Sequence, residues 1–222
     1  MGTIASRAAL DWIGKVRCTA IIRTNLKEAV GPAMSAAVEG GFGVVEFTLN
    51  TPGALDQIEA FAARGGLLVG AGTVLTSADV RNARSAGASF IVSPVTDPEI
   101  IRLCRDEDLL VIPGTQTPTE MMAAHTAGAQ MVKLFPCPED GPAHIRACLG
   151  PLPFLKIFPT SGVTEENVEE FFAAGVFGVG FVNCLFQPDD LAHGRFDVIR
   201  DRAARMVAKV AAATSRPPPS LS

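Results

Sequence analysis

Met131-Val132-Lys133-Leu134-Phe135-Pro136 is an apolar run that contains one charged residue, and the fold can be read outward from it. The β-branched and apolar residues around Lys133 predict a short buried strand. An ammonium group is costly to bury, so this lysine should be paired, extend to the surface or be held partly neutral. A neutral lysine amine is a nucleophile toward carbonyl carbon.

Seven similar runs recur on both sides of this one. We expect strands at 19–22, 44–48, 67–69, 90–92, 109–112, 131–134, 155–158 and 177–180. Helical spacing between and after them predicts helices that include 28–39, 77–86, 97–105, 119–127, 143–149, 165–174 and 197–212. Helix starts are also predicted at Thr51-Pro52 and Thr117-Pro118. Eight such units predict an α/β protein with a (β/α)8 TIM barrel, preceded by an additional N-terminal helix at residues 5–15.

The alternative architecture is a doubly wound open sheet. Such sheets often carry a Gly-rich dinucleotide fingerprint after the first strand. Here Ile22 is followed by Arg23-Thr24-Asn25, so that fingerprint is missing and the barrel is favoured.

Composition is consistent with one large domain that binds a small molecule. The chain has 222 residues, of which 48% are hydrophobic and 19% are charged. We expect a single barrel domain at 1–214 and a disordered Pro/Ser-rich tail at 215–222. A net charge of −4 without a basic run argues against nucleic acid and membrane partners.

The cysteines and the N-terminal segment predict a cytoplasmic location. Five cysteines are widely spaced without a Cys-x-x-Cys pair, and residues 1–25 contain no uninterrupted apolar segment. We therefore expect reduced thiols and neither a signal peptide nor a membrane span. The plastid stroma is the alternative if a transit peptide has been removed.

Glu46 is the carboxylate that accompanies Lys133. It lies in the apolar run Val44-Val45-Glu46-Phe47, and a carboxyl group buried there should be paired or have a raised pKa, which suits a proton carrier. Lowering the pKa of a lysine from about 10.4 to about 7.5 requires roughly 4 kcal/mol, which a desolvated interior can supply. The alternative is that Glu46 and Lys133 form a buried structural salt bridge.

A second lysine has almost the same neighbours in the sequence. Leu155-Lys156-Ile157-Phe158-Pro159 nearly repeats the segment around Lys133, and the residues alone do not choose between the two lysines. His125, His144 and His193 lie away from the expected strand ends, where a surface role is favoured. The spacing of potential ligands predicts no metal and no cofactor.

Six motifs resemble a known family, the class I pyruvate aldolases. These enzymes cleave 2-keto-3-deoxy-6-phosphogluconate (KDPG), its galactonate epimer and 4-hydroxy-2-oxoglutarate (KHG). The resemblance covers about residues 5–212. Its motifs are Ile-Ile-Arg23, Val-Glu46-Phe-Thr-Leu-Asn50, Val-Gly-Ala-Gly-Thr73-Val, Ile-Val-Ser93-Pro94, Ile-Pro-Gly114 and Val-Lys133-Leu-Phe135-Pro136.

The resemblance implies a role for each matched residue. Lys133 would form the Schiff base, leaving Lys156 outside catalysis, and Glu46 would move protons through a water molecule. The implied substrate contacts are Thr73 and Pro94 at the pyruvate end, Phe135 against the imine, and Arg23 on a carboxylate or hydroxyl. Asn50 stands where the gluconate branch often has arginine, as in the galactonate branch.

In the family that the chain resembles, two backbone turns bind the substrate phosphate. The family uses Gly-Gly and Gly-Ser turns, where this chain has Ser161-Gly162 and Val182-Asn183. Their backbone amides, with the side chains of Ser161 and Asn183, are the expected phosphate contacts. The Val182 side chain weakens that expectation and makes an unphosphorylated 4-hydroxy-2-oxo acid a competitor.

The expected activity is therefore cleavage of KDPG to pyruvate and glyceraldehyde 3-phosphate by a homotrimer without a cofactor. The alternatives are KHG or the galactonate epimer as substrate, or a non-catalytic ligand-binding barrel that has lost the phosphate site. A metal-dependent pyruvate aldolase is disfavoured because it needs a pair of carboxylates at the strand ends, and only Glu46 is found there.

Overall fold

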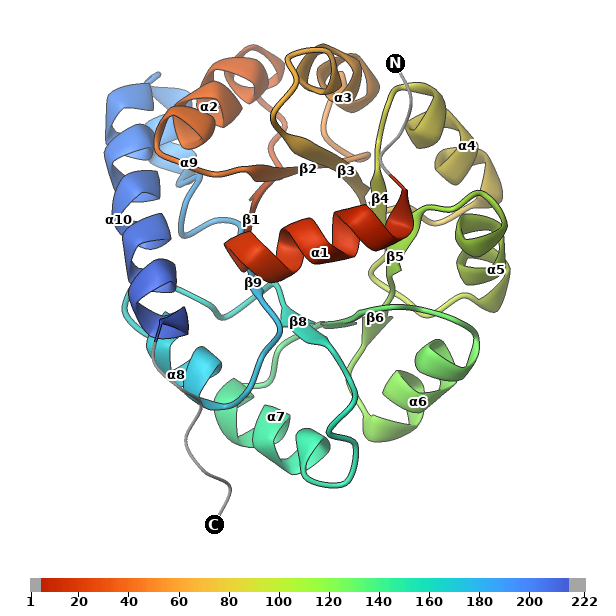
Figure 1. The fold of residues 1–222 in the computed structure, drawn as a ribbon. Coiled ribbons are helices and arrows are strands. Elements are labelled where there is room, and N and C mark those ends of the chain that lie inside the picture. Colours follow the sequence, from red (N-terminus) through yellow and green to blue (C-terminus); the bar gives the residue numbers. More distant parts are fainter. Residues whose placement is uncertain (1–4, 216–222) are drawn as a thin grey trace.

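Strands and helices alternate along most of the chain that the structure describes. The structure is a computed structural model, and it describes residues 5–215. The tail expected at 215–222 therefore lies outside the described residues except for Ser215. Figure 1 shows the strands at the centre and most of the helices around them.

The helices are α1 (Ser6–Val16), α2 (Lys27–Glu39), α3 (Ala54–Ala62), α4 (Ser77–Ser85), α5 (Pro98–Asp106), α6 (Pro118–Thr126), α7 (Gly141–Leu149), α8 (Val168–Ala173), α9 (Pro188–Ala192) and α10 (Phe196–Thr214). The strands are β1 (Cys18–Ile22), β2 (Val44–Thr48), β3 (Leu68–Gly72), β4 (Phe90–Val92), β5 (Leu110–Ile112), β6 (Gly114–Thr115), β7 (Val132–Leu134), β8 (Ile157–Pro159) and β9 (Val179–Phe181).

Most predicted elements are confirmed within a few residues, including the N-terminal helix α1. Helix α6 begins where Thr117-Pro118 predicts it, because Thr117 and Glu120 form a reciprocal capping box. Helix α3 follows the helix start that Thr51-Pro52 predicts, whereas α9 is absent from the predicted set. Helix α8 begins at Val168 and not at residue 165, because the preceding residues form a turn that Asn167 holds.

The strands form two parallel sheets. The larger has the order β5-β4-β3-β2-β1-β9 and the smaller has the order β6-β7-β8. Neighbours in the sheets follow chain order, apart from the pairing of β1 with β9, so the doubly wound alternative is wrong. The parallel α/β class is confirmed, but the ladders do not form one closed ring. They separate between β5 and β6, where Pro113 has no N–H to donate.

An apolar layer fills the interior at the amino ends of the strands. Because side chains alternate along a strand, Val44 shares its face with Glu46, and Met131 shares its face with Lys133. The inner core contains Ala9, Ile13, Val44, Leu68, Phe90, Val92, Leu110, Ile112, Met131 and Phe158. Helix α1 contributes the first two and crosses in front of the strands (Figure 1). The amino ends are thus closed, and the carboxyl ends carry the polar residues.

Among residues 5–215, no helix is both long enough and apolar enough to cross a bilayer.

Candidate active site

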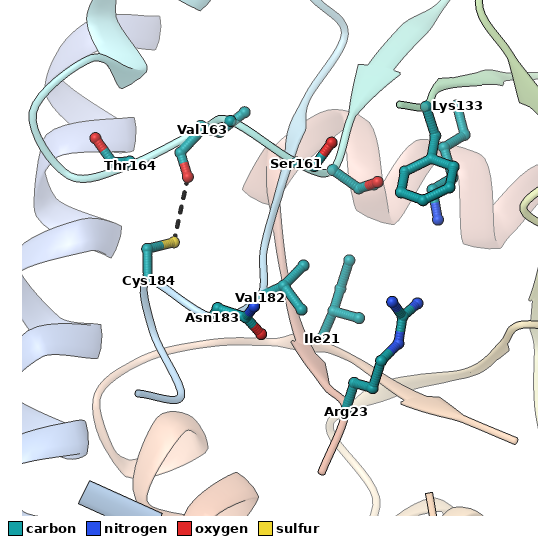
Figure 2. A pocket seen from close by; sticks show the side chains of 12 residues that line it. Ile21, Arg23, Lys133, Ser161, Val163, Thr164, Val182, Asn183 and Cys184 are labelled. Atoms are coloured by element: carbon teal, nitrogen blue, oxygen red, sulfur yellow. Dashed lines mark hydrogen bonds between the residues drawn. The ribbon is translucent and has the colours of Figure 1, made fainter. Parts of the chain in front are cut away.

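A cavity of about 330 Å³ opens at the carboxyl ends of β1, β7, β8 and β9. It is lined by Ile21, Arg23, Lys133, Phe135, Thr160, Ser161, Gly162, Val163, Thr164, Val182, Asn183 and Cys184. Figure 2 shows the amine of Lys133 and the guanidinium of Arg23 pointing into this cavity from opposite sides. Seven of the eleven residues predicted for the site line the cavity: Arg23, Lys133, Phe135, Ser161, Gly162, Val182 and Asn183.

Lys133 is held rigidly in the middle of β7. Its N–H donates to the carbonyl oxygen of Pro113 at 2.8 Å, and its own carbonyl accepts from the hydroxyl of Thr115 at 3.0 Å. The residue is 5% exposed, and its Nζ atom lies 4.6 Å from the ring centre of Phe135. Its amine is therefore desolvated but still reaches the cavity.

Glu46 is buried on β2, with 2% of its surface exposed. It stands opposite Ile21 of β1 and Gly70 of β3 in the parallel ladder. Its carboxyl group lies against the backbone of Gly72, where a Cβ would be 2.8 Å from the Glu46 Cδ atom. The absence of a side chain at Gly72 therefore provides the space that this carboxyl occupies.

Burial shifts the pKa values of both catalytic candidates toward their neutral forms. It raises the pKa of Glu46 above its usual range, although the positive charges of Lys133 and Arg23 pull that pKa down. It lowers the pKa of Lys133, a shift that Glu46 opposes and Arg23 reinforces. The three charged groups therefore influence one another through a poorly solvated interior.

Glu46 and Lys133 do not form a direct ion pair. The ion pairs found among residues 5–215 involve other side chains. The buried structural salt bridge that was the alternative for these two residues is therefore not present. Their separation leaves the Lys133 amine without a carboxylate bonded to it.

Arg23 is held near this pair by Thr73. Its Nη2 donates to the Thr73 hydroxyl at 3.4 Å. The backbone of Thr73 is left-handed, with φ of 57°, which is rare for a β-branched residue. Such a conformation persists only where the surrounding structure imposes it, and it directs this hydroxyl toward Arg23.

The second lysine lies in different surroundings from Lys133. Lys156 precedes β8, and its Nζ atom lies 5.9 Å from the ring centre of Phe177. Phe177 packs against the inner core on the side that α1 covers. Lys156 is not among the cavity residues. The two similar segments thus place their lysines in different parts of the interior.

The other four predicted residues are not among those that line the cavity: Glu46, Asn50, Thr73 and Pro94. Asn50 is exposed and lines a separate hollow beside α3 and α4, together with Asp56, Asp79 and Asn82. Thr73 and Pro94 are half-buried at the ends of β3 and β4. His125 and His193 are exposed, whereas His144 is half-buried with its Nε2 atom 2.7 Å from the carbonyl oxygen of Gln116.

The loops after β8 and β9 bring polar groups to the cavity. Ser161 Oγ accepts from the N–H of Cys137 at 3.1 Å, so the hydroxyl hydrogen remains available. The N–H groups of Gly162, Val163 and Asn183 take no part in the hydrogen bonds found within residues 5–215. These donors suit an anionic or strongly polar ligand.

Five cavity residues are not among the eleven predicted for the site: Ile21, Thr160, Val163, Thr164 and Cys184. Ile21 could have been found, because it lies two residues before Arg23 and so shares its strand face. The others adjoin predicted residues, but their contribution depends on the path of two loops.

Comparisons with known proteins identify the family of the chain. The family model described as "KDPG and KHG aldolase" matches residues 11–200. The chain is 34% identical over 181 residues to the 2-dehydro-3-deoxy-6-phosphogalactonate aldolase of Escherichia coli strain K12, covering 80% of this chain and 88% of that protein.

Solved structures show the same likeness. The structure entitled "Native KDPGal structure" has a TM-score of 0.81 and 32% identity, and covers 90% of this chain and 96% of its own. A KDPG aldolase from Legionella pneumophila, with pyruvate captured as a covalent carbinolamine intermediate, has a TM-score of 0.76 and 26% identity, and covers 87% of this chain and 97% of its own. The chain belongs to the KDPG and KHG aldolase family and is a carbon–carbon lyase.

Proposed function

We propose that Lys133 is the Schiff-base nucleophile of this aldolase and that Glu46 carries its protons. The observation that carries the proposal is the desolvated Lys133 amine, which reaches a cavity lined with polar groups and is not bonded to a carboxylate. Burial lowers the pKa of Lys133, so more of the amine is neutral at a given pH and able to attack a carbonyl. Burial raises the pKa of Glu46, so its carboxyl can both hold and release a proton.

The reaction begins with attack of the Lys133 nitrogen on the C2 carbonyl of a 4-hydroxy-2-oxo acid. Glu46, acting through a water molecule, supplies the proton that the carbonyl oxygen takes up, and the carbinolamine loses water to give a protonated imine. The Glu46 carboxylate then takes the proton of the C4 hydroxyl. The C3–C4 bond breaks, its electrons enter the iminium to form an enamine, and an aldehyde leaves.

Protonation of the enamine at C3 gives the imine of pyruvate, and hydrolysis releases pyruvate and regenerates the Lys133 amine. The ring centre of Phe135 lies 4.6 Å from the Lys133 Nζ atom, and the ring would limit water access to the imine. Arg23 lies within reach of the same space and would bind a substrate carboxylate or hydroxyl. Thr73 and Pro94 would bound the pyruvate end.

The proposed substrate is KDPG or its C4 epimer, the phosphogalactonate. Cleavage turns C4 into an aldehyde carbon, so both epimers give pyruvate and glyceraldehyde 3-phosphate. The similar proteins bear both names. The loop donors at Ser161, Gly162, Val163 and Asn183 support a phosphate at the far end of the substrate.

Pyruvate release tests this proposal when it is followed through a coupled lactate dehydrogenase assay. The two phosphorylated epimers and KHG are compared at equal concentration. Release from a phosphorylated epimer, lost in Lys133→Met, is expected. Faster turnover of KHG would make KHG the substrate in place of the phosphorylated epimers. Absence of pyruvate release from all three compounds would identify a non-catalytic ligand-binding protein.

The two sheets are proposed to be arcs of one (β/α)8 barrel that occupies residues 1–214. Strand β9 already pairs with β1, which brings the end of the chain back to its beginning. Between β8 and β9, the N–H of Phe177 donates to the carbonyl oxygen of Ile157 at 2.9 Å. Only the residue Pro113 separates β5 from β6.

A homotrimer is the proposed assembly, as the resemblance implies. The segments that follow β1, β2, β3 and β4 each expose a large apolar side chain at one rim: Leu26 (44% exposed), Leu55 at the start of α3 (37%), Leu75 (51%) and Val95 (51%). These strands are neighbours in the sheet, so the four side chains follow one another around the rim. An apolar rim of this kind suits contact with another copy of the chain.

A further inference from the structure

The side chain of Asn167 holds the loop after β8 at two points. Its Nδ2 donates to the carbonyl oxygen of Gly162 at 2.7 Å, and its Oδ1 accepts from the N–H of Thr164 at 2.8 Å. The loop between these two points contains a single residue, Val163. The amide of Asn167 therefore fixes the peptide groups on both sides of Val163.

Asn167 lies on the far side of this loop from the active-site cavity. It lines a second hollow of about 450 Å³, together with Glu170 and Phe171. Gly162 borders both spaces, whereas Asn167 borders only the second. The Gly162 carbonyl is therefore drawn away from the active-site cavity.

The direction of this carbonyl sets the direction of the next N–H. In a planar trans peptide the C=O and N–H groups point opposite ways. With the Gly162 oxygen bonded to Asn167, the Val163 N–H points toward the active-site cavity, which Val163 lines. The next peptide group, between Val163 and Thr164, has the matching orientation. The Val163 oxygen accepts from Cys184 Sγ at 3.2 Å on the cavity side, as Figure 2 shows.

The Val163 N–H donates none of the hydrogen bonds found in the described part of the chain. Ser161, on the same loop, keeps its hydroxyl hydrogen because Oγ is the acceptor from Cys137. The loop thus offers a fixed backbone donor and a hydroxyl donor to one ligand. A phosphate oxygen is the acceptor that such a pair suits best.

We infer that Asn167 is a positioning residue for the substrate phosphate. It does not touch the substrate; it orients the Val163 amide that does. The inference rests on the proposed function, because it requires a phosphorylated substrate. Without Asn167, the Gly162–Val163 peptide can rotate, and the donor no longer points into the cavity in every molecule.

The test compares a 2-dehydro-3-deoxy-6-phospho sugar acid with the same acid lacking phosphate. The variant is Asn167→Ala, and the matched control is Asn82→Ala, an exposed asparagine on α4. Loss of one hydrogen bond to a charged group predicts a rise in KM of about 10-fold or more for the phosphorylated acid. The kcat value, and kcat/KM for the unphosphorylated acid, should stay within about twofold of wild type. The control should match wild type on both substrates.

Inhibition by inorganic phosphate gives a second readout, and its inhibition constant should rise by a similar factor in Asn167→Ala. If that variant fails to fold, Asn167→Asp keeps the acceptor for Thr164 and removes the donor to Gly162, so the same loss is expected. If the wild-type protein prefers the phosphorylated acid and the Asn167 variants keep that preference, the inference about Asn167 is overturned and the proposed function still stands. A wild-type protein without the preference would overturn the phosphorylated substrate of the proposed function and this inference with it.

Discussion

The carboxyl group of Glu46 occupies the space above Gly72 that a side chain would fill. A Cβ at Gly72 would lie 2.8 Å from the Glu46 Cδ atom, closer than such atoms approach in proteins. The two residues are on adjacent strands, β2 and β3, whose ladder pairs Glu46 with Gly70 and Thr48 with Gly72. The position of the proposed proton carrier therefore depends on a glycine in the next strand.

Gly72→Ala should lower kcat by about 100-fold while leaving the protein folded. The added methyl group forces the Glu46 carboxyl away from its place, and misplacement of a catalytic group by about 1 Å has an effect of this size. Steady-state pyruvate release and a thermal melt measure the two quantities. Gly150→Ala is the control, because its Cβ would have only ordinary contacts, the nearest at 3.5 Å. Full activity in Gly72→Ala would contradict the role of Glu46.

The pH dependence of imine formation should report the charges around Lys133. The negative charge of Glu46 raises the pKa of Lys133, so Glu46→Gln should move the midpoint of imine formation with pyruvate to lower pH. Arg23 lowers that pKa, so Arg23→Met should move the midpoint to higher pH. Initial rates of borohydride trapping against pH measure both shifts. Arg84→Met, which breaks a surface pair with Glu107, should leave the midpoint unchanged.

Turnover in Glu46→Gln should fall by about 10²–10⁴-fold, the usual contribution of general acid–base catalysis. The amine of Lys133 remains in place, so pyruvate should still be trapped on it. Loss of turnover with retained trapping is the expected pair of results. Retained turnover would assign the proton transfers to another group.

Lys133→Met should stabilise the protein while abolishing activity. At pH values below 10.5, the pKa of an ordinary lysine, the unfolded chain carries a proton on the Lys133 amine. The folded chain binds that proton less readily, because burial lowers the pKa of Lys133. Wild-type stability should therefore rise with pH between the lowered pKa and 10.5, and the variant should lose that rise. Replacing a buried charge with an apolar side chain predicts a gain in Tm of about 2–6 °C at neutral pH. A Tm below that of wild type would show that Lys133 is held by favourable contacts.

The apolar rim gives a prediction about assembly. Val95→Asp and Leu75→Asp each place a charge at the proposed interface and should shift the protein from trimer to monomer in light scattering after size-exclusion chromatography. Phe154→Asp is the control, because Phe154 is 47% exposed but follows α7, away from these loops. An unchanged mass for both rim variants would locate any interface elsewhere.

The sequence predicted the strands well because their apolar, β-branched runs end in glycine, proline or polar residues. Helix α3 follows the helix start that Thr51-Pro52 predicts, whereas α9 was missed because its five residues carry little periodicity. Lys133 and Glu46 were predicted from their charges inside apolar runs. Asn167 could not be predicted, because its effect depends on which side of the Gly162 loop it lies. The local sequences of Lys133 and Lys156 are nearly the same, so the prediction that favours Lys133 comes from the family resemblance and not from the residues alone.

Lys133 is proposed to form the Schiff base, and borohydride reduction in the presence of pyruvate identifies the lysine that does so. Reduction converts the imine to a stable adduct, which peptide mass spectrometry assigns to one lysine. We expect a pyruvate adduct on the peptide containing Lys133 and none on the peptide containing Lys156, with labelling lost in Lys133→Met. An adduct on Lys156, or no adduct on the folded protein, would contradict it.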